Sequence, residues 1–269
     1  MAQALGGSVM ANGKSRSFVE QRRATIKEIL RTKGRASVAD LAEQLGISPL
    51  TVRRDLDYLE EQGIATRRYG EAILAEEGEV SVSEADPRVA ARSAIARAAA
   101  QLIEPHDLIF INTSSTALEM VPGIDAEGVT VVTNSAKAQR LPIPPSGMIL
   151  VTGGEVRPPR GVLSGEFALN NIRSVSATNA FLGCAGISLA AGVTSTTQQE
   201  ATVNSLMVER ADRMVLLADS SKLGIGAGFT YASLDHVTLL ITDTGATDED
   251  VEVLLEAGIH EIRRVEPLS

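Results

Sequence analysis

The chain has very little cysteine and histidine, with one Cys and three His among its 269 residues. A single Cys excludes a disulfide framework and a cysteine-rich zinc module. The three histidines, His106, His236 and His260, lack any metal-ligand spacing. No apolar run approaches the roughly 20 residues that a membrane helix needs, and the first residues do not form a signal-peptide pattern. We therefore expect a soluble, cytoplasmic protein with no metal, no other cofactor and no membrane partner.

Positive charge is also scarce, because 25 Lys and Arg face 34 Asp and Glu and give a net charge of −9. This balance argues at first against a nucleic-acid partner. However, residues 1–75 carry 12 basic and 9 acidic residues, a net charge of +3, whereas residues 76–269 carry 13 and 25, a net charge of −12. A basic head on an acidic body keeps DNA binding by the head open.

The head predicts a flexible tail followed by three short helices and a hairpin. Residues 1–17 are small and polar without periodicity, which indicates the tail. Apolar residues then recur at helical spacing up to Gly34, again from Ser37 to Gly46, and a third time from Ser48 to Gly63. A hairpin with a basic tip is expected over residues 64–74. This order predicts a winged helix-turn-helix over residues 18–74.

The body predicts an α/β domain over residues 88–269, after an acidic linker at residues 75–87 that ends in Pro. Its apolar runs end in small polar clusters: LIFI then NTSST, VTVV then TNS, MILV then TGG, AFL then GCAG, MVLLA then DSS, and VTLLI then TDTG. Runs without alternation are typical of strands buried on both faces of a mostly parallel sheet. Ligands bind beyond the carboxyl ends of such strands. The polar clusters there suit a hydroxylated or phosphorylated small molecule.

The third predicted helix carries the residues that suit contact with double-stranded DNA. It is the second helix of the predicted helix-turn-helix, and in such a motif the second helix enters the major groove. An Arg bridges guanine O6 and N7, and an apolar side chain packs on a thymine methyl. The alternative is three generic surface helices. The expected DNA-binding residues are Ser48, Leu50, Thr51, Arg53 and Arg54 on the helix, and Arg67 and Arg68 in the wing.

The stretch SVADLAEQLGISPLTVRRDLDYLEEQGIATRRYG resembles the DNA-binding domain of the DeoR family of bacterial transcriptional regulators. The segments TVRRDL and LEEQG are its most specific part. The likeness continues in order through IFINTSSTALEM, VVTNS, VTGGEVR, FLGCAGI, GVTSTTQQEA and LLADSSKLG, over about residues 18–250. The resemblance implies a sensor domain similar to ribose-5-phosphate isomerase, which binds a phosphorylated sugar or a related metabolite. Such binding usually releases the protein from its operator.

The resemblance also implies an effector site in the polar clusters. The family usually shows Asp-x-Gly-Thr-Thr where this chain has Asn112 to Thr116, an Asp where it has Ala185, and a Lys where it has Asn204. Two acids and a base are therefore missing. The expected effector-binding residues are Asn112, Ser114, Ser115, Thr116, Thr133, Asn134, Ser135, Gly153, Gly154, Arg157, Glu200 and Lys222. The alternatives are structural roles: helix caps, strand-end caps, a turn or a surface salt bridge.

Three functions remain compatible with these patterns. A sugar-phosphate isomerase needs a general base and a general acid near the carbonyl; Glu200 could be the base, but Asn112 and Ala185 leave the acid unfilled. A sensor needs only differential binding between two states. The third reading is a constitutive DNA-binding protein with a structural body. The sequence favours a non-enzymatic repressor of carbohydrate-metabolism genes, acting as a homodimer or homotetramer on paired half-sites.

Overall fold

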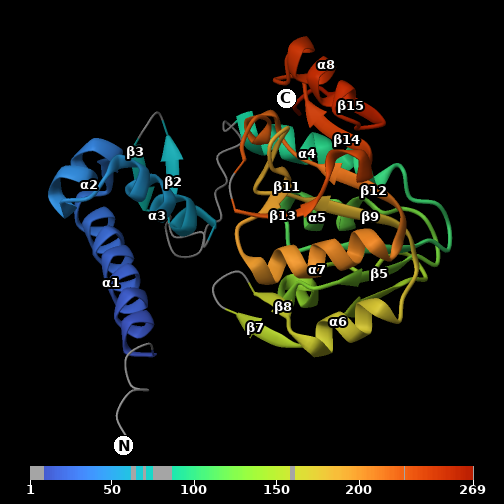
Figure 1. The fold of residues 1–269 in the computed structure, drawn as a ribbon, viewed down its shortest axis with the longest axis horizontal. Helices are drawn as coiled ribbons and strands as arrows, with labels where there is room; N and C mark the ends of the chain where they lie inside the picture. Colours follow the sequence, from blue (N-terminus) through green and yellow to red (C-terminus); the bar gives the residue numbers. More distant parts are fainter. Residues whose placement is uncertain are drawn as a thin grey trace, which may run out of the picture. The chain divides into compact units, whose positions relative to one another are not determined.

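A computed structural model describes residues 9–61, 65–68, 71–74, 87–157, 161–226 and 228–268. The chain forms two compact units, residues 1–82 and 83–269, which are described separately (Figure 1). The boundary falls inside the stretch expected as a linker, of which residues 75–86 lie outside the described residues. No helix in the described part of the chain is both long enough and apolar enough to cross a membrane.

The first unit combines three helices with a small antiparallel sheet, in the strand order β1-β3-β2. The predicted tail is helical from Val9 onward, because packed residues beyond Val19 nucleate α1 and no proline stops its extension towards the N-terminus. Strand β1 was not predicted. The elements are α1 Val9–Lys33, β1 Arg35–Ser37, α2 Val38–Leu45, α3 Pro49–Glu61, β2 Ala65–Arg68 and β3 Glu71–Leu74.

The three helices pack around one apolar core, as their periodicity predicted. Ile26 and Leu30 of α1 meet Leu41 of α2 and Leu56 of α3, and all four side chains are fully buried. Ser37 caps α2 by accepting a hydrogen bond from the backbone N–H of Asp40 at 3.0 Å. The core and the caps therefore hold α2 and α3 as a helix-turn-helix.

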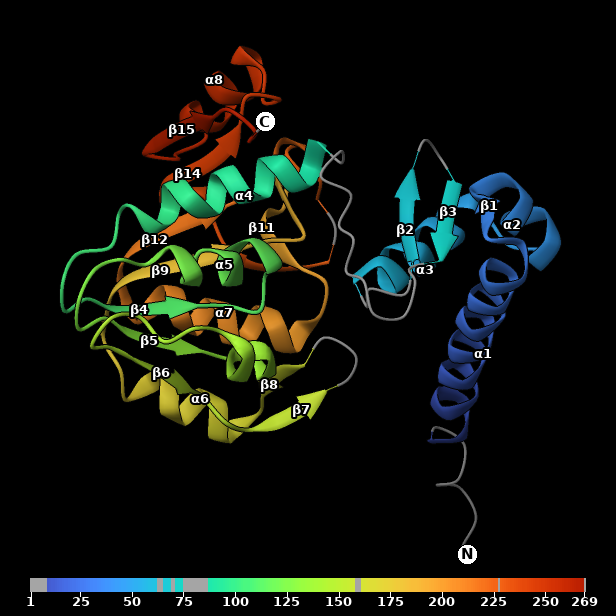
Figure 2. The same ribbon diagram turned by 180° about the vertical axis from the view of Figure 1, so that it is seen from behind.

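The second unit is built on a seven-stranded parallel sheet in the order β15-β14-β12-β9-β4-β5-β6 (Figure 2). Six of these strands contain the six apolar runs of the sequence; β15 was not predicted. The strands are β4 Leu108–Ile111, β5 Thr130–Thr133, β6 Met148–Val151, β9 Ala177–Gly183, β12 Ala211–Leu217, β14 Val237–Asp243 and β15 Glu261–Val265.

Helices cover both faces of this sheet, which is why its strands are apolar on both sides. Alternate strand residues such as Phe110 and Leu182 pack with α7 (Gln198–Glu209) and α6 (Glu166–Arg173). Their neighbours Ile109 and Phe181 pack instead with α4 (Pro87–Ala100) and α5 (Ser115–Glu119). Figures 1 and 2 show the two helix layers on opposite faces. Helix α8 (Asp248–Glu256) follows β14.

Two small antiparallel elements lie beside the main sheet. One is the sheet β10-β11-β13, formed by Gly186–Ser188, Gly192–Ser195 and Phe229–Ala232; the other is the hairpin of β7 (Glu155–Arg157) and β8 (Val162–Ser164). In the main sheet, Ile111 is paired with Thr133 and with Phe181. The polar residues that follow β4, β5 and β9 therefore lie side by side at the carboxyl ends of these strands.

Candidate functional sites

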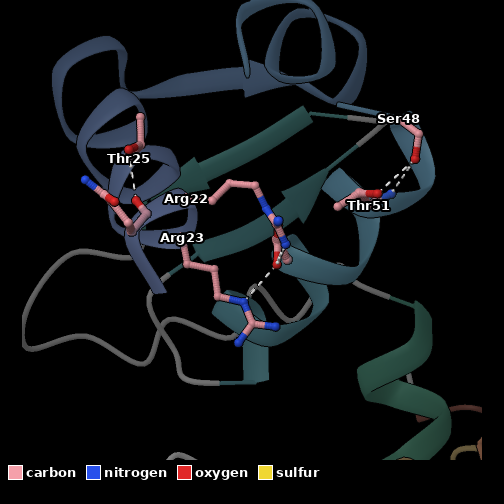
Figure 3. Close-up of polar contacts among 7 residues, drawn as sticks. Arg22, Arg23, Thr25, Ser48 and Thr51 are labelled. Carbon is pink, nitrogen blue, oxygen red and sulfur yellow. Dashed lines mark hydrogen bonds and ion pairs between the residues drawn. The ribbon is translucent and has the colours of Figure 1, made fainter. Parts of the chain in front are cut away.

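The first turn of α3 is fixed by a serine cap. The backbone N–H of Thr51 donates to Ser48 Oγ at 3.2 Å, and the two side-chain hydroxyls lie 2.9 Å apart (Figure 3). Pro49 occupies the first helical position, where its missing N–H costs nothing. Ser48 and Thr51 therefore serve first to begin the helix, with Ser48 exposed and Thr51 half-buried.

Helix α3 has an inner face and a basic outer face. Val52, Leu56 and Leu59 are buried in the core of the unit, whereas Arg53 and Arg54 are exposed. Two exposed guanidiniums near the beginning of this helix fit contact with base edges and phosphates in a major groove. The side chains of Leu50, Arg67 and Arg68 lie outside the described residues, although Arg67 and Arg68 end β2 opposite β3.

A buried carboxylate that the sequence analysis missed ties α3 to α1. Asp55 is 1% exposed and accepts from Arg22 Nη2 at 3.1 Å and from Arg23 Nε at 2.8 Å (Figure 3). Its hydrogen bond raises the pKa of Arg22 above the ordinary value. The signal was present, because Asp55 falls within the stripe of Val52, Leu56 and Leu59 and an acid there needs a cation.

In the second unit, Asn112 joins the ends of β4 and β9. Its Nδ2 donates to the carbonyl of Gly183 at 3.0 Å, and its Oδ1 accepts from the N–H of Gly183 at 3.1 Å and from that of Ser114 at 3.2 Å. The Nδ2 also lies 3.4 Å from Asn204 Oδ1. Both ends of this buried amide are thus engaged within the protein, and Asn112 holds the two strand ends together.

The residues after Asn112 begin α5 and press against β9. A Cβ placed on Gly183 would lie 2.0 Å from Ser114 Oγ, so only glycine fits there. Ser114 occupies the N-cap position of α5 without a side-chain cap. Ser115 is exposed and Thr116 is buried. This loop therefore leaves the hydroxyl of Ser115 accessible, with Ser114 half-buried behind it.

The cluster Thr133, Asn134 and Ser135 after β5 is fully buried. Thr133 Oγ1 accepts from Ser135 N at 3.2 Å, and Ser135 Oγ accepts from Lys137 N at 3.2 Å, so both hydroxyls cap turns. Asn134 Nδ2 donates to the carbonyl of Leu163 at 3.4 Å. Its Oδ1 has no hydrogen-bond partner among the described residues and is the acceptor that this cluster leaves open.

The pair Gly153 and Gly154 turns the chain out of β6. Both have positive φ, 66° and 106°, and a Cβ on Gly154 would lie 2.3 Å from the carbonyl oxygen of Ser164. Both glycines are exposed. The turn, which was the structural alternative to effector binding, is therefore present, and effector binding by these glycines stays a prediction. Arg157 belongs to β7, and its side chain lies outside the described residues.

Glu200 and Asn204 present one side of α7 to the strand ends. Glu200 is buried, its N–H donates to the N-cap Thr197 at 3.2 Å, and its Oε2 accepts from Thr196 at 2.8 Å. Asn204, one turn further, donates to Ser195 Oγ at 2.9 Å and contacts Asn112. Residues four apart share a helix face, which explains why both are buried here.

Lys222 lies at the mouth of β12, close to the thiol of Cys184. Burial raises the pKa of Cys184 to about 12, and the nearby charge of Lys222 acts in the opposite direction. Lys222 is half-buried at the end of the turn Ser220–Lys222. Among the described residues, it forms no ion pair. It is thus a cation beside the strand ends whose charge is available to an anion.

The predicted effector residues therefore fall into connected groups. Asn112 and Ser114 lie against Gly183, Glu200 lies one turn before Asn204 on α7, and Lys222, after β12, lies near Cys184, after the neighbouring strand β9. Tyr231 was missed; its buried hydroxyl donates to the carbonyl of Gly183 at 3.0 Å, and burial raises its pKa. Ser195 of β11 and Asn204 of α7 were also absent from the expected site residues, because only the folded chain brings them to Asn112. Within the described residues, no three His, Cys, Asp or Glu side chains gather as metal ligands.

Comparison with known proteins covers both units. The family model of a DeoR-like helix-turn-helix domain matches residues 22–78, and the model of a DeoR C-terminal sensor domain matches residues 88–244. The HTH-type transcriptional regulator GlpR of Haloferax volcanii is 30% identical, over 89% of this chain and 95% of its own length. The HTH-type transcriptional repressor GlcR of Bacillus subtilis is 30% identical, over 84% and 89% respectively.

Among solved structures, ribose 5-phosphate isomerase A of Methanocaldococcus jannaschii matches with a TM-score of 0.36 and 17% identity, over 51% of this chain and 55% of that one. A likeness of this extent carries no conclusion about function.

Proposed function

The chain belongs to the DeoR family of transcriptional regulators, and we propose that it is a repressor that binds an operator through α3 and is released by a small effector. The observation that carries the proposal is the rigid presentation of Arg53 and Arg54: Ser48 begins α3, the core holds its inner face, and Asp55 ties it to α1. The printed name of GlcR, a transcriptional repressor, supports the direction of regulation.

Readout and positioning are divided between α3 and the wing in this proposal. Arg54, with Leu50, Thr51 and Arg53, contacts base edges, whereas Arg67 and Arg68 at the wing contact phosphates. Ser48 orients the first turn. Because one helix-turn-helix covers a small footprint, two or more copies bind paired half-sites. The acidic second unit, which repels DNA, confines contact to the first.

The test of DNA binding compares arginines with different roles on an operator selected from random DNA. We expect Arg54→Ala to cost about 1–3 kcal/mol and to relax specificity at one base pair. Arg67→Ala should instead weaken binding to all sequences and lower the salt slope by about one. Arg31→Ala, an exposed arginine at the end of α1, is the matched control for loss of charge. If Arg54→Ala and Arg67→Ala respond identically to salt and sequence, this division is wrong.

We propose that the effector is a phosphorylated sugar or a related metabolite held at the carboxyl ends of the strands. Lys222 supplies a positive charge, Ser114, Ser115 and Thr116 supply the loop that begins α5, and Asn134 supplies an open acceptor. Thr133, Ser135, Gly153 and Gly154 shape the strand ends, and Arg157 is a second candidate cation. Asn112 and Glu200 line the centre of the site.

The effector test is a thermal-shift screen with sugar phosphates, followed by titration of the best hit against the protein–operator complex. Lys222→Ala deletes a charge-assisted contact worth about 1.5–3 kcal/mol, so it should raise the effector requirement roughly ten- to a hundredfold. Arg213→Ala is the matched control, because Arg213 is an exposed cation near the amino end of the same strand, β12. A Lys222→Ala protein that responds at the wild-type concentration would remove Lys222 from the site.

The alternative function is an isomerase with an accessory DNA-binding unit, with Glu200 as the base. Its neighbours count against it, because Asn112 and Asn204 are amides that neither take nor give protons at neutral pH. We expect no interconversion of ribose 5-phosphate and ribulose 5-phosphate. Turnover on the order of 1 per second that disappears in Glu200→Gln would favour the enzyme instead.

A further inference from the structure

Large apolar side chains are exposed along one edge of the main sheet. The described residues include eleven exposed large hydrophobic side chains, and six of them lie between residues 143 and 167: Ile143, Met148, Leu150, Val151, Val156 and Phe167. Three of these six make up most of strand β6, where Met148 is 51%, Leu150 is 44% and Val151 is 43% exposed. We call Ile143 together with β6 the β6 edge. An apolar strand that is half open to water marks a surface that is covered when the protein is assembled.

The backbone of β6 is also open on this side. Strand β6 ends the sheet and is paired only with β5 among the described strands. The N–H groups of Met148 and Thr152 donate to Val129 and Thr133 at 3.0 Å each, so they point towards β5. Because hydrogen-bonding groups alternate along a strand, those of Ile149 and Val151 point away from the sheet. The edge therefore offers donors and acceptors to another strand.

Strand β6 lacks two of the features that usually protect an edge strand, although it has only four residues and Pro142, Pro144 and Pro145 precede it. Natural edges are guarded by charged residues, by prolines within the strand or by bulges. Residues 141–154 contain no charged residue, and β6 itself contains no proline. Its pairing with β5 runs without a register shift. An uncharged, apolar edge strand of this kind is a template for pairing with a strand of another chain.

The charge of the second unit indicates which partner this is. Residues 76–269 carry a net charge of −12, so two copies repel each other over most of their surfaces. The uncharged stretch 141–154 is where two copies approach with least repulsion. An antiparallel pair of identical strands is also self-complementary about a two-fold axis, since each copy gives the other the same donors and acceptors.

We propose that the β6 edge is the interface with a second copy of this chain, in which the two β6 strands pair antiparallel and join the two sheets into one. Leu150 and Met148 then pack against the other copy. The helix α6, which carries the exposed Phe167, is tied to the end of β6 by a hydrogen bond from Asn171 Nδ2 to the carbonyl of Thr152 at 2.9 Å. Helix α6 therefore extends the interface between the two copies beyond β6. This interface is independent of the proposed operator and effector.

The test is the mass of the full-length protein in solution, measured without DNA by sedimentation velocity across micromolar concentrations. The wild type should be dimeric or a multiple of a dimer. Leu150→Lys places a charge on the apolar edge of both copies and should raise the dissociation constant of the dimer roughly ten- to a hundredfold. Leu255→Lys is the matched control, because Leu255 of α8 is 42% exposed and belongs to a different part of the unit.

Two outcomes would overturn the proposal. One is a wild-type protein that stays monomeric at 100 micromolar, roughly a hundredfold above a micromolar dissociation constant. The other is a Leu150→Lys protein that dimerises as the wild type does, or no more weakly than Leu255→Lys. Circular dichroism checks that each variant is folded. If Leu150→Lys is not folded, Met148→Lys at the more exposed position takes its place with the same expectations.

Discussion

Replacing Asp55 with alanine tests the link between α1 and α3, the second helix of the helix-turn-helix. Asp55 is 1% exposed, while the side chains of Arg22 and Arg23 are 24% and 25% exposed. Breaking a buried pair by removing one partner costs about 3–5 kcal/mol. Because both arginines remain about a quarter exposed and can rehydrate, we expect a smaller cost than that range, about 2–3 kcal/mol for the first unit.

The measurement is hydrogen exchange of the α3 amides by mass spectrometry, which reports opening of the first unit alone. Protection in α3 should fall roughly 30- to 160-fold in Asp55→Ala, which is the same free energy at about 1.36 kcal/mol per factor of ten. Glu43→Ala removes an exposed acid of α2 in the same unit and should stay within about 0.5 kcal/mol of wild type. The double variant Arg22→Ala/Asp55→Ala should be less destabilised than the sum of its single changes. Equal exchange in Asp55→Ala and Glu43→Ala would refute this account of the contact.

Two further predictions concern the strand ends of the second unit. Cys184 is half-buried, and burial raises its pKa to about 12 from an ordinary 9.0. At pH 8 it should therefore react with a thiol reagent roughly a hundred- to a thousandfold more slowly in the folded protein than in urea, and equal rates in both states would contradict the shift. Its contribution to stability should decline above pH 9, where only the unfolded chain loses the proton. Gly183→Ala should destabilise the second unit by about 1–3 kcal/mol, since the new Cβ would lie 2.0 Å from Ser114 Oγ. Ser114→Gly should restore much of this loss in a thermal melt, and a Gly183→Ala protein that melts like the wild type would show that the contact is not tight.

The elements that sequence patterns predicted are those set by local rules. The stripe of α3 repeats with the helical period, and the uninterrupted apolar run of β4 is typical of a strand buried on both faces, so helix and strand both follow from the order of apolar residues. Ser37 and Ser48 sit at helix starts because a side-chain oxygen satisfies a free backbone N–H there. Parallel strands then bring the polar residues that follow their carboxyl ends to the same side of the sheet. For this reason the groups around Asn112 and Lys222 could be predicted to lie near one another.

The contacts that the sequence did not reveal join residues far apart in the chain. Strand β1 has three residues and forms only because β3 provides its partner. Tyr231 reaches Gly183 across 48 positions. Asp55 was visible as an acid in an apolar stripe, but its partners Arg22 and Arg23 were not. The start of α1 was misjudged for a related reason, since a helix nucleated by tertiary packing extends through a polar stretch that has no periodicity of its own.

The contact between Asn112 and Asn204 changes the meaning of two departures from the family pattern. The family pattern implied by the resemblance has an acid at the first position and a lysine at the second, and in this structure Asn112 Nδ2 and Asn204 Oδ1 lie 3.4 Å apart. A single replacement would leave one buried charge without its partner, which is strongly destabilising. Two amides avoid that penalty, because they carry no charge and find hydrogen-bond partners inside the cluster. Asn112 Nδ2 donates to the carbonyl of Gly183, and Asn204 Nδ2 donates to Ser195 Oγ. The two departures therefore fit a single neutral exchange, and under the proposed function Lys222 supplies the positive charge for an anionic effector.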